Sequence, residues 1–392
     1  MGLIDGVAAT QEDMTRWRRD LHRKPETAFE ERWTSDYIAE RLTEFGIEIH
    51  RGLAETGIVG VIHGKGGGNR AIGLRADMDA LDILEANTFD HRSQHDGKMH
   101  ACGHDGHSTM LLGAAKHLAE TRNFSGTLYV VFQPAEENEG GAGVMVEEGM
   151  FDQFPMDAIY GMHNRPGLPV GKMIMRAGPT MAGFDIFDII VDGYGGHGAM
   201  PHQTVDPVVV QAHLVTALQT LTSRNLNPLE SAVVSVTQVH GGDAYNVIPQ
   251  QVKLSGTVRT FKPEVQDLVE AGIKRIAAHV GDTFGAKVDV AYDRRYPPLF
   301  NYADHMALCH KAAIDVFGED NVRNDAPPVM ASEDFAFFLQ AKPGCYVNIG
   351  NGEGDEGGCM VHNPNYDFND KALSYGASYW VTLAENLLPL KG

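Results

Sequence analysis

The sequence predicts an α/β protein: a mostly parallel sheet with helices on both faces, plus a smaller inserted α+β domain. Two observations lead to this prediction. Helix-like and strand-like segments alternate up to residue 182 and again from residue 295, which is typical of a parallel sheet covered by helices. Between them, the strands are longer and alternate in polarity, with two helices among them. We therefore expect a discontinuous larger domain, 1–182 with 295–392, and an inserted domain, 183–294.

The individual elements follow from the hydrophobic period and from glycine-rich turns such as KGGGNR at 65–70. In the larger domain the predicted helices are 11–24, 31–45, 107–122 and 371–388, with another beginning at 140. The strands predicted there are 56–64, 71–77, 126–133, 157–163 and 344–352. In the inserted domain the predicted strands are 184–193, 232–242 and 252–261, and the predicted helices are 206–222 and 263–284.

The composition excludes several classes of function. The formal net charge of −20 repels nucleic acid and anionic membranes, so we expect neither as a partner. No stretch approaches the roughly 18 apolar residues of a membrane span, and the N-terminus does not resemble a secretory signal, which predicts a cytoplasmic protein. The four cysteines have no regular spacing and do not form a disulfide framework.

Metal-binding residue types gather at the predicted strand ends. Ligands of open α/β sheets lie beyond the carboxyl ends of the strands, so these side chains are expected to meet at one edge. Asp77 ends strand 71–77 and Asp79 follows it, Glu136 and Glu137 follow strand 126–133, and His163 ends strand 157–163. Cys102 and His104 precede a helix beginning near Gly106, and His362 lies in a later loop. A shared metal site accounts for the whole set better than separate structural roles.

Five of these residues are counted as candidate ligands, all of types that bind Zn²⁺, and five is too many for one open catalytic site. They are Cys102, His104, Glu137, His163 and His362. The number suits two ions that share a bridging ligand or water. Thiolate and imidazole favour zinc, whereas manganese, cobalt and nickel stay possible.

Glu136 has a role distinct from its neighbour, because adjacent residues rarely both bind one ion. A free carboxylate beside the metals can act as general base on water and return the proton to a leaving amine. Asp77 fits a supporting role, orienting a histidine ligand through a hydrogen bond, and His107 is expected to support the site. Two other classes stay open: a thiol hydrolase with Cys102 as nucleophile and His104 as base, and a non-catalytic metal-binding protein.

The chain resembles the metal-dependent aminoacylase/carboxypeptidase (zinc peptidase) family through motifs spread over nearly its whole length. These are RRDLHRKPETAFEE, RADMDAL, MHACGHDGHSTMLLGAA, QPAEENEGGAGVMVEEG, GMHNRPGLPVG, GGHGAMPHQTVDP, ASEDFAFF and CMVHNPNYDF. Within the family the chain is most similar to the amidohydrolase branch of hippurate hydrolases, N-acyl-L-amino acid amidohydrolases and auxin-conjugate hydrolases. The resemblance implies the same five ligands for a two-metal centre, with Glu136 as the catalytic base.

The resemblance also implies roles for the inserted domain, as a lid through which relatives form dimers. His197 matches a histidine that stabilises the oxyanion, sometimes in the partner's site. Asn246 and Arg259 match positions that hold the substrate carboxylate, as a bidentate guanidinium is suited to do. Gly198 stands where alanine is expected. A homodimer or homotetramer through the lid is the expected assembly.

The expected activity is therefore hydrolysis of the amide bond of N-acyl amino acids, which releases a carboxylic acid and a free amino acid. The alternative is a carboxypeptidase or dipeptidase that uses the same two-metal site. The residues do not distinguish the two, because acyl-pocket size and any contact with a free amine decide between them.

Overall fold

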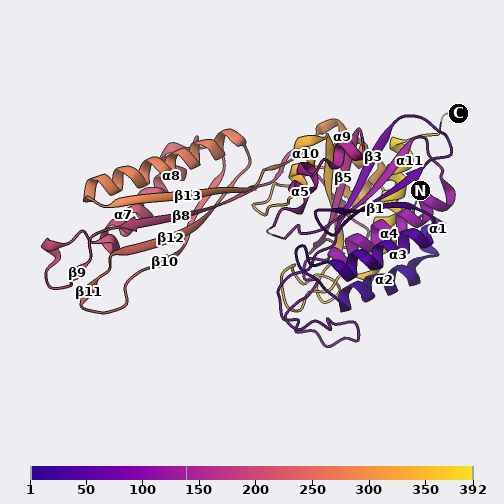
Figure 1. Cartoon of the computed structure of the whole chain (residues 1–392). Coiled ribbons are helices and arrows are strands. Elements are labelled where there is room, and N and C mark those ends of the chain that lie inside the picture. The colour runs from indigo at the N-terminus through magenta and orange to yellow at the C-terminus, as the bar shows by residue number, and fades with distance from the viewer. Residues whose placement is uncertain (1, 138, 391–392) are drawn as a thin grey trace. The chain divides into compact units, whose positions relative to one another are not determined.

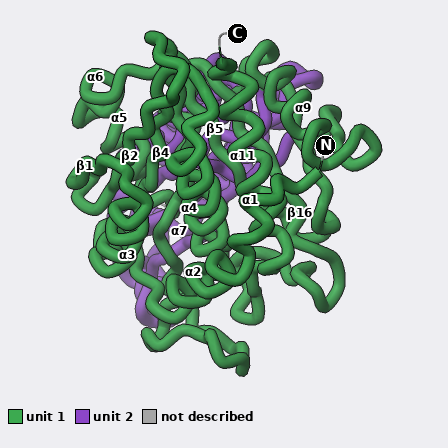
Figure 2. Tube along the Cα trace, turned by 90° about the vertical axis from the view of Figure 1, so that its right-hand side faces the viewer, with its two compact units in different colours: residues 1–178, 300–327, 334–392 green, residues 179–299, 328–333 purple. Residues whose placement is uncertain are grey.

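The computed structural model describes residues 2–137 and 139–390, which form two compact units (Figures 1 and 2). Unit 1 comprises residues 1–178, 300–327 and 334–392, and unit 2 comprises residues 179–299 and 328–333. The sequence placed the boundaries at 182/183 and 294/295 and assigned 328–333 to the larger domain. Segment 328–333 belongs to unit 2 because the carbonyls of Val329 and Ala331 accept hydrogen bonds from the amide of Ala182.

The described residues of unit 1 form an eight-stranded sheet. In spatial order its strands are β1 (Glu48–Leu53), β2 (Gly57–His63), β4 (Thr127–Gln133), β3 (Ala71–Asp77), β5 (Ala158–Pro166), β16 (Gly344–Gly352), β6 (Met173–Ile174) and β15 (Val322–Arg323). The central strands β4, β3, β5 and β16 are parallel, whereas β1 and β2 extend the sheet in antiparallel pairing. The strand ends that carry polar residues therefore meet at one edge, as predicted.

Helices cover both faces of this sheet. Ile72 and Leu74 of β3 are buried in the same apolar core as helices α4 and α11, while Arg75 lies over the Phe335 ring of α10 on the opposite face, at 5.6 Å. The helices of unit 1 are α1 (Asp5–Ala8), α2 (Gln11–Arg23), α3 (Arg32–Glu44), α4 (His104–Thr121), α5 (Gly141–Glu147), α6 (Met150–Gln153), α9 (Ala303–Phe317), α10 (Phe335–Ala341) and α11 (Leu373–Leu387). Among the described residues, no helix has both the length and the apolar character to cross a bilayer. The arrangement confirms the predicted fold class.

Helix α4 begins at His104, two residues earlier than the predicted start near Gly106, so His104 does not precede the helix but opens it. Its N-cap is Gly103, which has φ +94° and lacks the side-chain cap that usually marks a helix start in a sequence. A Cβ on Gly103 would lie 2.4 Å from polar atoms of both Asn164 and Tyr366. The glycine therefore allows the chain to turn tightly between Cys102 and His104.

A buried ionic network ties helix α2 to the start of α4 and to the C-terminal loop. Arg18 is 1% exposed, and its guanidinium donates to Asp367 and Asp370 at 2.7 Å each. His22 is fully buried one turn further on, and its Nδ1 lies 2.8 Å from the carboxylate of Asp105 on α4. Removing one partner of such a pair costs several kcal/mol, because the remaining charge stays buried and unpaired. The network fixes the N-terminal turn of α4 against α2.

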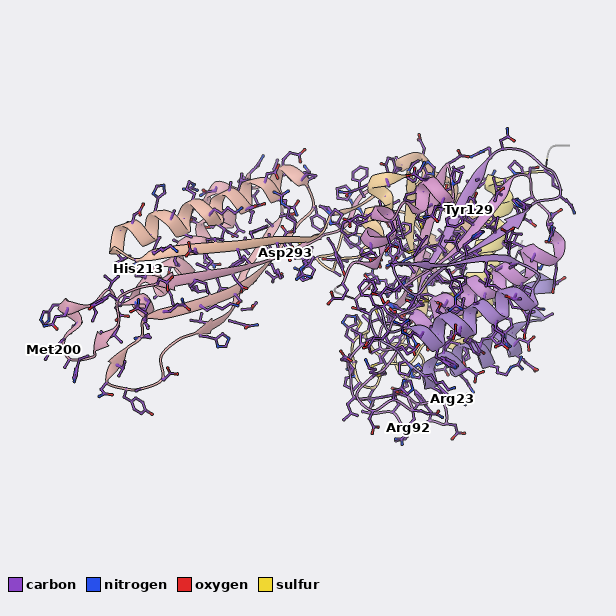
Figure 3. The ribbon with its side chains drawn as sticks, in the orientation of Figure 1. Arg23, Arg92, Tyr129, Met200, His213 and Asp293 are labelled. Carbon is purple, nitrogen blue, oxygen red and sulfur yellow. The ribbon has the colours of Figure 1, made fainter. Side chains whose placement is uncertain are left out.

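Unit 2 is a four-stranded antiparallel sheet over its described residues, backed by two helices. In spatial order the strands are β10 (Ala232–His240), β12 (Gln251–Thr260), β8 (Gly183–Asp192) and β13 (Lys287–Tyr296), and the helices are α7 (Pro207–Thr220) and α8 (Pro263–Phe284). His213 of α7, labelled in Figure 3, packs against Phe284 of α8 with ring centroids 4.7 Å apart. A small ribbon, β9 (Gly196–His197) with β11 (Val247–Ile248), extends this unit, and short strands β7 (Gly178–Met181) and β14 (Leu299–Asn301) lie at the chain boundaries of the units.

We expect His22 to make the free energy of unfolding decrease at alkaline pH. Burial lowers its pKa, but Asp105 and Glu85 outweigh burial and raise the pKa to about 9, above the ordinary 6.5. The stabilisation is therefore complete below about pH 6.5 and is lost as pH rises through about 9, an effect on the order of a few kcal/mol.

Thermal unfolding in chelator between pH 6 and 9.5 checks this prediction. The midpoint of the wild type should fall several degrees further over this range than that of His22→Gln. The exposed His50, changed to Gln, is the control. Parallel curves for wild type and His22→Gln would contradict the prediction.

Candidate metal centre

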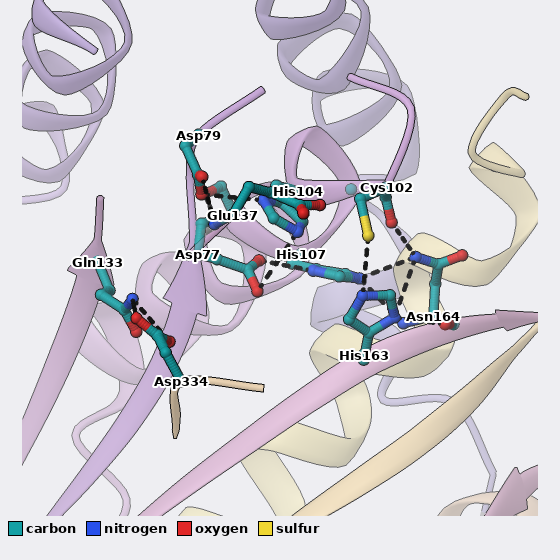
Figure 4. A network of polar contacts seen from close by, with 12 residues as sticks. Asp77, Asp79, Cys102, His104, His107, Gln133, Glu137, His163, Asn164 and Asp334 are labelled. Atoms are coloured by element: carbon teal, nitrogen blue, oxygen red, sulfur yellow. Dashed lines mark hydrogen bonds and ion pairs between the residues drawn. The ribbon is translucent and has the colours of Figure 1, made fainter. Parts of the chain in front are cut away.

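The five predicted ligands come together in unit 1, at the edge where the parallel strands end. Figure 4 shows four of them, Cys102, His104, Glu137 and His163. His163 lies near the end of β5, and Glu137 follows β4. Cys102 and His104 lie at the start of α4, and His362 comes from the C-terminal loop. Four distant parts of the chain thus supply the set.

The ligand atoms form two overlapping groups. Sγ of Cys102 lies 3.3 Å from Nε2 of His163, and Nε2 of His362 lies 3.1 Å from Oε1 of Glu137. Cys102 groups with His104 and His163, and also with Glu137 and His362, with every pair of ligand atoms in a group within 4.8 Å. The two groups would offer enough ligands to hold two divalent ions.

The donor set fits divalent metal by its chemistry. Nδ1 of His104 is bonded to Asp79 at 3.1 Å, while its buried Nε2 makes no hydrogen bond to any described residue. Burial, together with the charges of Glu137 and Glu136, raises the pKa of the Cys102 thiol well above its ordinary value. The thiol hydrolase hypothesis pairs Cys102 with His104, whereas the Cys102 thiol lies 3.3 Å from Nε2 of His163 and the His104 ring is bonded to Asp79.

Two aspartates, Asp79 and Asp77, form hydrogen bonds to different residues of the site. Asp79 accepts a hydrogen bond from the amide of Glu137 at 2.9 Å in addition to its contact with His104, so it orients two predicted ligands at once. Asp77, to which the sequence assigned this kind of role, lies 2.6 Å from Nδ1 of His107. Burial lowers the pKa of His107 to about 4, which keeps its Nε2 available as an acceptor. Sequence reasoning gave Asp79 no separate role, since both residues follow the same strand.

Asn164 is a further supporting residue that sequence reasoning missed. It is 2% exposed, and its side-chain amide donates to the carbonyl of Cys102 at 2.6 Å. Its backbone amide donates to His107 at 2.9 Å, and its Oδ1 accepts from the hydroxyl of Tyr366 at 2.8 Å. The one available signal was its position directly after His163. Asn164 thus connects the start of α4, the end of β5 and the C-terminal loop.

Glu136 lies beside the ligands and is 7% exposed. One of its carboxylate oxygens groups with ligand atoms of His104 and Glu137 within 4.8 Å. The residue before it, Ala135, has φ +55°, a left-handed conformation that alanine rarely adopts. Strained backbone of this kind is often found at functional sites.

The three predicted residues of the inserted domain lie in unit 2. His197 and Asn246 are both exposed. They lie next to each other, because His197 pairs with Val247 and the amide of Gly198 donates to the carbonyl of Asn246 at 2.8 Å. Arg259 lies on β12, with its guanidinium 4.3 Å above the ring of Phe184. Their roles in binding or catalysis stay predictions.

Comparison with known proteins identifies the family. The sequence model of peptidase family M20/M25/M40 matches residues 73–386. The hippurate hydrolase of Campylobacter jejuni is 39% identical over 384 residues, which cover 98% of this chain and 99% of that protein. The N-acetyl-L-cysteine deacetylase of Bacillus subtilis is 38% identical over 376 residues, covering 95% and 87%.

A solved structure agrees with this. A Bacillus subtilis protein described as a dinuclear metal binding peptidase of the M20 family superimposes with a TM-score of 0.85 at 33% identity, covering 98% of this chain and 100% of that chain. The family is the one that the sequence motifs indicated. The chain belongs to peptidase family M20/M25/M40.

Proposed function

We propose that this protein is a metallo-amidohydrolase that cleaves the amide bond of N-acyl amino acids. The proposal depends on one observation: five side chains of metal-binding types lie in two overlapping groups, and the carboxylate of Glu136 lies beside them. Relatives named as a hippurate hydrolase and an N-acetyl-L-cysteine deacetylase, similar over nearly the whole chain, support this substrate class.

Cys102, His104, Glu137, His163 and His362 would hold the two ions. When bound, divalent ions supply Lewis acidity toward the substrate carbonyl and lower the pKa of water. Glu136 takes the proton from the attacking water and delivers it to the amide nitrogen as the amine leaves. Its position beside His104 and Glu137 supports this path.

Zinc is the metal we propose. The set contains one thiol and three imidazoles, and these ligand types favour zinc over the harder ions. Manganese, cobalt and nickel are the alternatives that metal analysis of purified protein would reveal.

Unit 2 is proposed to act on the substrate's carboxylate and on the oxyanion. Arg259 and Asn246 would bind the carboxylate, and His197 would donate to the oxyanion, in its own subunit's site or its partner's. The exposure of His197 and Asn246 supports a role toward a ligand rather than in the core of unit 2. A cytoplasmic location stays a prediction from the sequence.

We also propose that unit 2 forms a homodimer through strand β10, alone or as half of a tetramer. β10 is an edge strand without charge from Ala232 to Val239, whereas the opposite edge, β13, carries five charged residues over Lys287–Arg295. Charged edges resist pairing and uncharged edges invite it. Sedimentation equilibrium should show a dimer or tetramer, whose mass Val239→Lys halves and Val239→Thr preserves. A monomeric wild type would contradict the proposal.

Amine release from a panel of substrates tests the function. Metal-loaded protein should release amino acids from N-benzoyl, N-acetyl and longer N-acyl amino acids, and chelator should abolish the release until Zn²⁺ or Mn²⁺ is restored. Cleavage of dipeptides alone would replace the proposal with the carboxypeptidase or dipeptidase alternative. Release that is insensitive to chelator would contradict a metal-dependent mechanism.

Glu136→Gln separates catalysis from metal binding. We expect it to keep its metal content and to lose about 10³-fold in kcat, because the amide cannot accept the proton. Glu139→Gln, an exposed neighbour, is the control and should be as active as wild type. Cys102→Ala should instead lower metal occupancy. Unchanged turnover in Glu136→Gln would exclude the general-base role.

A further inference from the structure

The motif RRDLHRKPETAFEE, residues 18–31, supplies no ligand, yet it ends in a fully buried carboxylate. Glu31 is 0% exposed and is the N-cap residue of α3. Its Oε2 accepts from the hydroxyl of Thr56 at 2.9 Å, and its Oε1 accepts from the backbone amide of Ala135 at 2.9 Å. Burial, and then the charge of Asp79, raise its pKa to about 7. A carboxyl group is costly to bury in this way unless its hydrogen bonds compensate.

The contact with Ala135 lies next to the proposed general base. Ala135 is fully buried with φ +55°, a conformation that only the surroundings can maintain in a residue other than glycine. Its carbonyl accepts from the amide of Gly141 at 2.9 Å, where an added Cβ would lie 1.9 Å from the carbonyl oxygen of Pro134. The turn after β4 is therefore folded tightly onto the start of α5.

The backbone on both sides of Glu136 is held by a buried carboxylate. Glu31 binds the amide of Ala135, and Asp79 binds the amide of Glu137 at 2.9 Å. These two anchors come from segments more than 40 residues apart in the chain. Both hydrogen bonds are made by amides of the turn from which the Glu136 and Glu137 side chains project.

We propose that Glu31 is a positioning residue for the general base: its carboxylate holds Ala135 in the left-handed conformation that directs Glu136 and Glu137 into the metal centre. The inference rests on the proposed roles of those two glutamates. It gives the N-terminal motif a function, although none of the five predicted ligands comes from residues 18–31.

Glu31→Ala, Ala135→Gly and the double variant test this. Supporting residues of metal sites typically account for about 10–100-fold in activity or metal affinity. Glu31→Ala should therefore lower kcat by about 100-fold with little change in KM, and weaken Co²⁺ binding, followed by thiolate-to-metal absorption, by about 10-fold. Adding Ala135→Gly should restore about 10-fold of the lost kcat, because glycine adopts positive φ without strain.

Glu26→Ala is the matched control, since Glu26 belongs to the same motif and accepts from the amide of Thr34 rather than from the turn. It should lower the thermal unfolding midpoint and leave kcat unchanged. If Glu31→Ala does not fold, Glu31→Gln, which keeps an acceptor for the Ala135 amide, should retain kcat within about fivefold of wild type. An equal loss in Glu26→Ala, or no recovery on adding Ala135→Gly, would overturn the proposal.

Hydrogen exchange separates this inference from the proposed function. Peptides covering 129–141 should exchange faster in Glu31→Ala than in wild type, and Glu26→Ala should not change them. Hydrogen exchange and Co²⁺ binding both test the positioning role of Glu31 even if the protein cleaves no N-acyl amino acid. Unchanged exchange in Glu31→Ala would contradict the positioning role whatever the substrate is.

Discussion

The burial of several acidic groups at the ends of β3 and β4 is the constraint on which the rest of unit 1 depends. Asp77, Asp79 and Glu136 are all 7% exposed or less. Carboxylates buried this closely destabilise the fold unless positive charge balances them. Arg75, fully buried, bonds to Asp77 at 2.8 Å and extends on its other side to Asp334 at 3.2 Å. The remaining negative charge is what makes the site suitable for divalent cations.

The same constraint explains why the supporting residues come from so many segments. A metal ligand keeps its orientation when its backbone or its ring is hydrogen-bonded to a neighbouring protein group. The Cys102 carbonyl is bound by Asn164, and the His362 amide donates to Ala101 at 2.7 Å. Helix α2 supports the centre through the Arg18 network, and the C-terminal loop does so through the hydrogen bond between Tyr366 and Asn164. Glu31 supports it through the amide of Ala135.

Much of the fold was predictable, because most elements carry their own periodic signal. Helix 263–284 and strand 344–352 have the predicted bounds. Strand β1 (48–53) and the two-residue strands β6 and β15 were missed because they exist through pairing with neighbours rather than through a pattern of their own. Strand β13 (287–296) and helix α9 (303–317) were not predicted either. The start of α4 was misjudged because its cap is a left-handed glycine, not a capping side chain.

Residue types and their spacing were enough to identify the thiol, imidazoles and carboxylates at the strand ends and the family to which they belong. Residue type and spacing suffice for this, because the ends of parallel strands must meet at one edge. The supporting contacts became visible in the folded chain alone: Asp79 bonds to His104, Asn164 to the carbonyl of Cys102, and Glu31 to the turn before Glu136. Hydrogen bonds between segments far apart in the chain depend on side-chain direction to within an ångström, and no local pattern records that.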